Sequence, residues 1–161
     1  MNILVISHLY PSPSNSYYGL FVHNQVKALS KKGVNVTVVS PRPWVPNILE
    51  NFSYQKAMVE RNLFKTSLDN IPLYYPKYLS IPRQKFYELS VFFVLMSINK
   101  LVKELHKCNN FDLIHAHVAL PDGYAAMRLS KKLNVPYMVT VHGADLYGNI
   151  HKSKYCYTII R

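Results

Sequence analysis

The chain has 161 residues, which is enough for one domain with a sizeable core and too few for two ordinary domains. Hydrophobic residues make up 49% of it, which excludes an intrinsically disordered protein, and its most lipid-like stretch, residues 89–98, is too short to span a bilayer. The formal net charge of +11 predicts attraction to an anionic partner: nucleic acid, an anionic membrane or a phosphorylated small molecule. A domain whose basic side chains simply face water is equally consistent with this charge.

Strand and helix patterns alternate in the first part of the chain. Residues 2–7 (NILVIS) are predicted to form a buried strand, because the run is apolar, β-branched and too short for a helix. A loop over residues 8–19 leads into a predicted helix over 20–33, where apolar residues recur at helical spacing and Gly33 ends the pattern. Residues 34–41 are predicted to form a second strand.

The middle of the chain is less regular. Residues 42–70 are expected to be mostly loop, with a short helix near 53–64. Residues 71–76 fit a strand, and residues 82–107 fit a long helix whose middle is apolar nearly all round. The middle of this helix should therefore be covered on most sides.

The alternation returns at the end of the chain, with a strand over 111–117, a helix over 121–134 and a strand over 135–141. The strands are continuous apolar runs, as expected for strands that are covered on both faces. We therefore predict an α/β fold with a Rossmann-like parallel sheet and helices on both faces. In such sheets, ligands bind beyond the carboxyl ends of the strands.

Four of the seven histidines fall at these predicted strand ends: His8, His115, His117 and His142. His115 and His117 are two residues apart, so both should point to the same side of their strand. A zinc site needs three or four ligands, and no cluster of Cys or Glu accompanies the pair, so we expect no metal. One of the two is expected to hydrogen-bond to a ligand.

Two glycine-containing turns are further candidates. Gly19 precedes a helix, where a glycine lets backbone amides approach a phosphate, or it serves only the dihedral angles of its loop. His142 and Gly143 directly follow a predicted strand, and Asp145 then either accepts hydrogen bonds from substrate hydroxyls or caps a helix. These alternatives remain open from the sequence.

Several enzyme classes lack their motifs in this chain. There is no G-x-G-x-x-G and no G-x-x-x-x-G-K-[ST], which argues against a nicotinamide dehydrogenase and a P-loop nucleotidase. The order of residues suggests no Ser-His-Asp triad, and the eight acidic residues suggest no hydrolytic carboxylate pair.

Both ends of the chain resemble the N-terminal domain of retaining glycosyltransferases of family 4, which have the GT-B fold. The glycine-ended loop and helix within residues 2–41 carry part of the resemblance. Residues 111–147 (FDLIHAHVALPDGYAAMRLSKKLNVPYMVTVHGADLY) carry the rest, through a pattern close to D-x-I-H-x-H, P, G and V-x-T-x-H-G-x-D. The resemblance is weak through residues 42–110.

The resemblance implies an enzyme with two Rossmann-like domains that face each other across a cleft, of which residues 1–161 are the acceptor-side half. It implies no cofactor, because a nucleotide-sugar serves as co-substrate, and no required metal. By position, Gly19 matches a glycine near the donor diphosphate, and His142 matches the catalytic histidine near the transferred sugar. The donor-binding C-terminal domain is expected to be absent from this chain, which should then be inactive alone, or nearly so.

The acceptor side is matched by His117, Asp122 and Gly123, together with Asp145 after the His-Gly pair. The resemblance implies a glycan or lipid-linked acceptor, used in the synthesis of cell-surface polysaccharide or glycolipid. Such an enzyme would be cytoplasmic. The basic, aromatic stretch 42–100 would either dock it on the anionic inner face of the membrane or place its aromatic residues in the core.

Two other readings remain. The chain could be a non-catalytic binding module that uses its basic surface for an anionic membrane or for nucleic acid. No nucleic-acid partner is expected, because the basic residues are dispersed along the chain and the sequence contains no signature of a nucleic-acid-binding module. A flavodoxin-like regulator would need an acidic cluster after the first strand, and residues 7–16 contain none.

Overall fold

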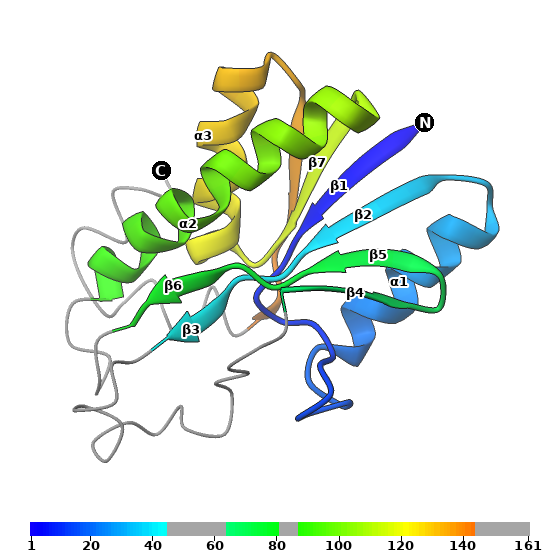
Figure 1. Cartoon of the computed structure of the whole chain (residues 1–161), viewed down its shortest axis with the longest axis horizontal. Coiled ribbons are helices and arrows are strands. Elements are labelled where there is room, and N and C mark those ends of the chain that lie inside the picture. The colour runs from blue at the N-terminus through cyan, green and yellow to red at the C-terminus, as the bar shows by residue number, and fades with distance from the viewer. Residues whose placement is uncertain (45–63, 81–86, 144–161) are drawn as a thin grey trace.

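The computed structural model describes residues 1–44, 64–80 and 87–143, and these residues form an α/β domain (Figure 1). Within them, a six-stranded sheet has, in spatial order, the strands β4 (Lys65–Leu68), β5 (Ile71–Tyr74), β2 (Asn35–Val39), β1 (Asn2–Ile6), β7 (Leu113–His117) and β8 (Tyr137–Thr140). All neighbouring strands are parallel except β4, which pairs antiparallel with β5. The predicted fold class is confirmed, with one antiparallel edge strand that was not predicted.

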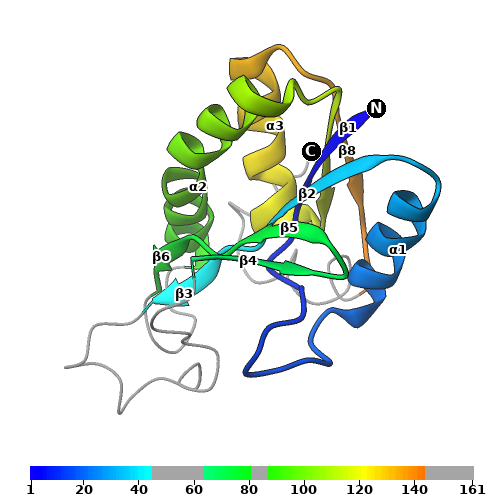
Figure 2. The same ribbon diagram turned by 45° about the vertical axis from the view of Figure 1, so that its right-hand side comes forward.

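Helices cover both faces of the sheet (Figures 1 and 2). Helix α1 (Leu20–Lys31) lies on one face, and α2 (Tyr87–Asn109) and α3 (Tyr124–Leu133) lie on the other. The alternating sides of β1 supply both cores, since Ile3 and Val5 belong to the cluster on the α1 side while Leu4 and Ile6 belong to the cluster on the α2 and α3 side. This explains why β1 is apolar at every position.

Helix α1 shows how local sequence sets an element. Val22 and Val26 are four residues apart and fully buried against the sheet, which stabilises the domain by about 1.5–3 kcal/mol each. The helix ends where Gly33 adopts φ 80° and its amide donates to the carbonyl of Ser30. That left-handed conformation suits glycine and confirms the predicted stop.

Two short strands, β3 (Arg42–Trp44) and β4, lie within residues 42–70, which were expected to be mostly loop, and a third, β6 (Lys77–Leu79), lies where no element was predicted. Strands β3 and β6 form a separate parallel pair, and β4 forms a hairpin with β5. Their sequences RPW, KYL and KTSL show no apolar strand pattern, and pairing with a neighbouring strand holds them extended. The short helix expected near 53–64 falls outside the described residues, apart from residue 64, which is not helical.

The helix predicted over 121–134 is divided. A single wide turn, η4 (Ala119–Gly123), carries the Pro-Asp-Gly sequence, and α3 begins only at Tyr124. Leu120 interrupts the turn with a non-helical, extended conformation. As a result, Asp122 lies in a buried turn at the end of β7, where it faces the loop after β1.

Candidate active site at the carboxyl ends of the strands

Buried polar atoms without a hydrogen-bond partner gather at one edge of the sheet. Within the described ranges they are Ser40 Oγ, Arg42 Nε, His117 Nε2 and Asp122 Oδ1. Ser40 follows β2, Arg42 begins β3, His117 ends β7 and Asp122 lies in η4, so all four belong to segments at the carboxyl ends of parallel strands. Buried polar groups are normally satisfied, and such a concentration is typical of a ligand site.

The loop after β1 and the turn after β7 meet through His8 and Asp122. The carboxylate of Asp122 is fully buried; its Oδ2 accepts a hydrogen bond of 3.0 Å from the backbone amide of His8 and lies 2.7 Å from His8 Nδ1. The side chain of His8 is 25% exposed, so one edge of this buried pair reaches solvent. The pair joins residues that are 114 positions apart in the sequence.

The remaining strand-end histidines form a stack. The rings of His115 and His117 have centroids 4.3 Å apart, which confirms that they point to the same side of β7. The ring of His142 lies nearly parallel to that of His117, and His142 Nε2 is 3.3 Å from His117 Nδ1. His115 is bound by Thr140, whose hydroxyl lies 2.8 Å from His115 Nε2.

Two histidines of this stack, His115 and His117, are held in the neutral state. Burial, with smaller contributions from the neighbouring His115 and His142, lowers the pKa of His117 to about 3. Burial also lowers the pKa of His115. In a neutral imidazole one ring nitrogen donates a hydrogen bond and the other accepts one. The buried Nε2 of His117 therefore remains available for a hydrogen bond to a ligand.

Helix α1 reaches the same place through its first turn. The ring of Phe21 meets that of His142 edge-on, with centroids 4.7 Å apart. The turn after β8 therefore lies beside the start of α1.

Gly19 itself is explained by the path of the chain. It adopts φ 67° at the start of α1, and a Cβ atom there would run into the backbone of Leu9 and Tyr10. Both facts require glycine without any ligand. The role of Gly19 at a donor phosphate stays a prediction, and its requirement in the loop is a structural finding.

Arg42 was not predicted as a site residue, yet it is a buried cation beside this edge. Its guanidinium donates hydrogen bonds to the backbone carbonyls of Tyr10 at 2.6 Å and His8 at 3.4 Å, and lies 4.9 Å from the centre of the Tyr75 ring. Only 4% of the residue is exposed, and no carboxylate of the described residues pairs with it. A permanent positive charge in this position favours an anionic group nearby.

Two other predicted residues complete the account. Gly123 is buried, and an added Cβ would lie 3.2 Å from both the Val118 carbonyl oxygen and a methyl group of Val139, so the glycine also serves close packing of η4 on β8. Asp145 lies outside the described residues. In the ranges 1–44, 64–80 and 87–143, no group of three or more His, Cys, Asp or Glu residues is placed to hold a metal ion.

The histidines at the site could be found from the sequence because they end apolar strands. The sequence does not predict that His8 pairs with Asp122 or that Arg42 is buried, because each depends on contacts between distant segments. The dipeptide Asp69-Asn70 was a missed signal for the β4–β5 hairpin, because both residues adopt positive φ, as a tight hairpin turn requires.

The fold and the strand-end site define an α/β domain of the class that binds ligands at the carboxyl edge of a parallel sheet. The family model of Glycosyltransferase Family 4 matches residues 19–160. The chain therefore belongs to glycosyltransferase family 4.

Individual relatives agree with this assignment. The chain is 35% identical over 158 residues to TuaC of Bacillus subtilis (strain 168), which is named as a glycosyltransferase of teichuronic acid biosynthesis; the match covers 96% of this chain and 39% of that protein. It is also 35% identical over 63 residues to the uncharacterized glycosyltransferase MJ1178 of Methanocaldococcus jannaschii, with 38% of this chain and 18% of the relative covered. The chain thus spans well under half the length of either relative.

The structural likeness concerns the fold. Sucrose-phosphate synthase from Thermosynechococcus elongatus superposes with a TM-score of 0.68 at 15% identity, over 99% of this chain and 39% of that structure. The chain therefore shares its fold with one part of that structure.

Proposed function

We propose that the chain is the acceptor-side domain of a retaining glycosyltransferase, which transfers a sugar from a nucleotide-sugar to a glycan or lipid-linked acceptor in the synthesis of cell-surface polysaccharide or glycolipid. The observation that carries the proposal is the gathering of buried, unpartnered polar atoms at the strand ends of a family 4 domain. The name of TuaC supports a cell-wall glycan as the product class.

The proposed reaction breaks the bond between the anomeric carbon and the donor phosphate, and forms a bond from that carbon to an acceptor hydroxyl oxygen. The hydroxyl proton leaves with the departing phosphate, so atoms and charge balance without a protein nucleophile, and none is assigned. Positive charge develops on the sugar and negative charge on the phosphate, and fixed dipoles aimed at these charges lower the barrier.

In this scheme, His142 contacts the transferred sugar, and Gly19 lies near the donor diphosphate at the start of α1. His142 suits that role because it stands half-exposed at the end of β8, with one face against the buried ring of His117. His117 stays neutral because its pKa is low, so it can accept a hydrogen bond from His142 or donate one to it.

The acceptor is assigned to the neighbouring surface formed by His117, Asp122 and Gly123, with Asp145 in the same role. Asp122 Oδ1 has no hydrogen-bond partner among the described residues, and a sugar hydroxyl that donates to it would satisfy this buried oxygen. Arg42 adds a positive charge that suits a phosphate-bearing acceptor.

The test measures the transfer of labelled sugar from a panel of nucleotide-sugars to acceptors present in a lipid extract. It is run first with the 161-residue chain and then with the protein encoded by the longest reading frame that contains it. We expect the chain alone to be inactive or nearly so, because donor binding belongs to a second domain. In the longer protein, we expect His142→Gln to lower kcat by roughly 10²–10³-fold, the scale of losing one group that stabilises the transition state.

The matched control is His106→Gln, at the far end of α2, where the ring packs on Phe111. This variant should leave kcat unchanged.

The stereochemistry of the product is determined by NMR, and the anomeric configuration of the transferred sugar should match that of the donor. Equal rates for the chain and the longer protein would contradict the assignment of the chain as the acceptor-side domain, and an inverted product would contradict the retaining mechanism. Tight, salt-sensitive DNA binding without transfer would favour the non-catalytic alternative.

We also propose that the protein is cytoplasmic and docks on the anionic inner face of the membrane through one stripe of α2. Leu89, Phe92 and Met96 are exposed at helical spacing, and the same stripe continues with the exposed residues Lys100, Lys103 and Lys107. Exposed apolar residues followed by lysines suit insertion beside acidic headgroups. None of the helices in the described ranges has the length and hydropathy to cross a membrane.

Co-sedimentation with phosphatidylglycerol and phosphatidylcholine vesicles tests this docking. We expect binding only to the anionic vesicles, and a loss of about tenfold or more for Met96→Glu, which places a charge in the apolar half of the stripe. The matched control is Met138→Glu, since Met138 is 45% exposed on β8, compared with 60% for Met96. Equal losses for the two variants would remove α2 as the docking element.

A further inference from the structure

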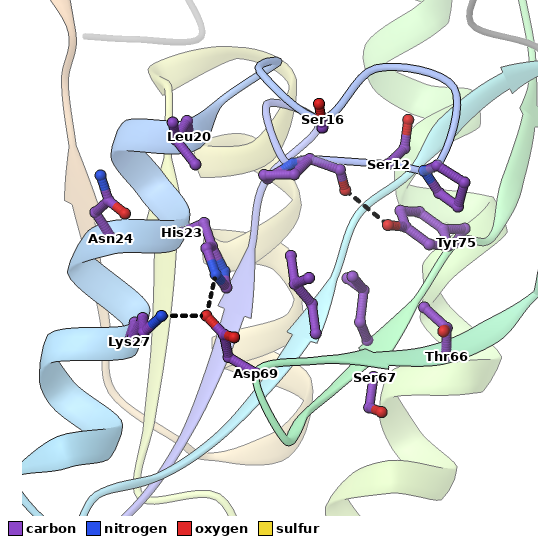
Figure 3. A pocket seen from close by; sticks show the side chains of 14 residues that line it. Ser12, Ser16, Leu20, His23, Asn24, Lys27, Thr66, Ser67, Asp69 and Tyr75 are labelled. Atoms are coloured by element: carbon purple, nitrogen blue, oxygen red, sulfur yellow. Dashed lines mark hydrogen bonds and ion pairs between the residues drawn. The ribbon is translucent and has the colours of Figure 1, made fainter.

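A second pocket lies on the α1 face of the sheet, apart from the strand-end histidines. Its volume is about 450 Å³, within the range of roughly 300–1,000 Å³ that is usual for small-molecule sites. Figure 3 shows its walls: the loop that follows β1, the inner side of α1 and the β4–β5 hairpin. No role in sugar transfer proposed above uses this pocket.

The lysine and the carboxylate in the pocket wall form an ion pair. Lys27 Nζ lies 2.6 Å from Asp69 Oδ2, and His23 Nε2 lies 3.0 Å from the same oxygen (Figure 3). His23 Nδ1 is in turn 2.8 Å from the hydroxyl of Tyr10, so both ring nitrogens are used. Lys27 hydrogen-bonds to Asp69 and holds the pKa of that carboxyl below its usual value, with His23 acting in the same sense, so the carboxylate stays ionised. The pocket therefore offers no surplus positive charge to a phosphate.

Neutral hydrogen-bonding groups surround this ion pair. Ser16, Asn24 and Thr66 line the pocket, and their side chains make no hydrogen bond to any other described residue. Leu20 and Tyr75 add apolar surface, and the Tyr75 hydroxyl is held in place by a 2.7 Å hydrogen bond to the Pro11 carbonyl. Hydroxyl and amide groups that alternate with apolar surface, beside one oriented carboxylate, match a ligand with many hydroxyls and no net charge.

We propose that this pocket binds a neutral saccharide, held mainly by the Asp69 carboxylate and by the Thr66 hydroxyl. A carboxylate accepts hydrogen bonds from two adjacent sugar hydroxyls, and Lys27 and His23 hold it in position for that contact. The site requires no transfer chemistry, so it can exist whether or not the proposed glycosyl transfer is correct.

The experiment is a titration of the 161-residue chain with maltose, cellobiose and N,N′-diacetylchitobiose, followed by amide chemical shifts. Inorganic phosphate and glucuronic acid serve as anionic probes. We expect at least one neutral disaccharide to shift the amides of pocket residues such as Asn24, Thr66 and Asp69, while phosphate leaves them unchanged.

Asp69→Asn should weaken saccharide binding roughly ten- to hundredfold, the scale of losing charge-assisted hydrogen bonds. The substitution keeps the hairpin, because Asp69 has φ 50° and asparagine tolerates that conformation. Its matched control is Asn70→Asp in the same turn, which does not line the pocket and should leave affinity within twofold. Thr66→Val removes one hydroxyl at constant shape and should cost roughly threefold to tenfold.

Three outcomes would overturn the proposal. One is the absence of any pocket shift with all three disaccharides at saturating concentration. Another is a pocket that responds to phosphate and not to neutral sugars, which would indicate an anion site. The third is disaccharide shifts confined to His117 and His142, which would support the proposed acceptor site and remove this one.

Discussion

The two ends of the parallel sheet are built from the same strands and differ in how their polar groups are satisfied. At the amino end, the side-chain amide of Asn2 donates to the Asn109 carbonyl at 2.6 Å and its oxygen accepts from Asn35 at 3.0 Å, while its backbone amide donates to Asp112 at 2.7 Å. These contacts tie β1, β2, α2 and the residue before β7 together. At the carboxyl end, four buried polar atoms of the described residues have no partner.

This difference in hydrogen bonding suggests that the amino end of the sheet stabilises the domain and that the carboxyl end binds a ligand. The amino end closes on itself with short hydrogen bonds near the surface, so it needs nothing else. The carboxyl end keeps desolvated donors and acceptors, and such atoms cost free energy unless a ligand or water binds them. Substitutions at the two ends should therefore have different consequences.

The largest expected effect on stability comes from Gly19→Ala at the carboxyl end. The substitution combines an unfavourable positive φ with a clash against the Leu9 backbone, and we expect it to lower the free energy of unfolding by about 2–5 kcal/mol. Gly33→Ala is the matched control, because Gly33 has φ 80° with nothing within 4 Å of an added Cβ. Its cost should be about 1–2 kcal/mol in urea unfolding, and equal costs would refute the crowding at Gly19.

A smaller effect is expected from pH. The pKa of His117 is about 3 in the folded chain and near its ordinary 6.5 in the unfolded chain, so the unfolded chain binds more protons between these values. Stability is therefore full above pH 6.5 and falls as the pH drops toward 3, by up to about 1.4 kcal/mol per pH unit from this residue. His115, whose pKa is also lowered, acts in the same direction.

His117→Gln should reduce that slope by up to the same amount, because it removes one group that takes up a proton on unfolding. Urea unfolding at several values between pH 7 and pH 4 measures the slope. The control is the parent chain, measured in the same buffers. If His117→Gln and the parent chain lose stability in parallel, the histidine is not held neutral by its burial.

The smallest effect is expected at the amino end. Asn2→Ala removes three side-chain hydrogen bonds near the surface, to Asn35, Asn109 and Asn110, and we expect a loss of about 1–2 kcal/mol in the free energy of unfolding. Sugar transfer by the longer protein, measured in the same preparation, should not change. A drop in kcat without a drop in stability would mean that the amino end contributes to the site, and the comparison of the two ends would fail.

Much of the fold could be predicted because β1, β2, β7 and β8 are apolar runs separated by helical patterns. Strands β3, β4 and β6 could not be predicted, because residues such as Lys65, Ser67 and Lys77 are typical of loops. Pairing with partner strands holds these segments extended. The same limit applies to η4, where tertiary packing of Gly123 on Val139 delays the start of α3.

For the candidate site, the spacing of His115 and His117 was sufficient to predict a shared side of β7, because side chains alternate along a strand. The resemblance gave roles to Gly19, His142, Asp122 and Gly123 by position. Asp122 and Gly123 lie in the turn after β7, and His142 follows β8 beside the start of α1, where Gly19 lies. The catalytic and binding roles of these residues remain predictions to be tested by the experiments above.

The sequence by itself determined the α/β class, the order of the main elements and the edge of the sheet where polar groups collect, because these follow from local periodicity and from the rule that parallel strands end on one side. Only the tertiary structure decided that His8 pairs with Asp122, that Arg42 is buried without a carboxylate partner among the described residues, and that His23 and Lys27 converge on Asp69. Each of these contacts joins segments that are distant in the chain. The charge of a buried side chain depends on its partners and on its loss of water contact, and both are set by what surrounds it in space.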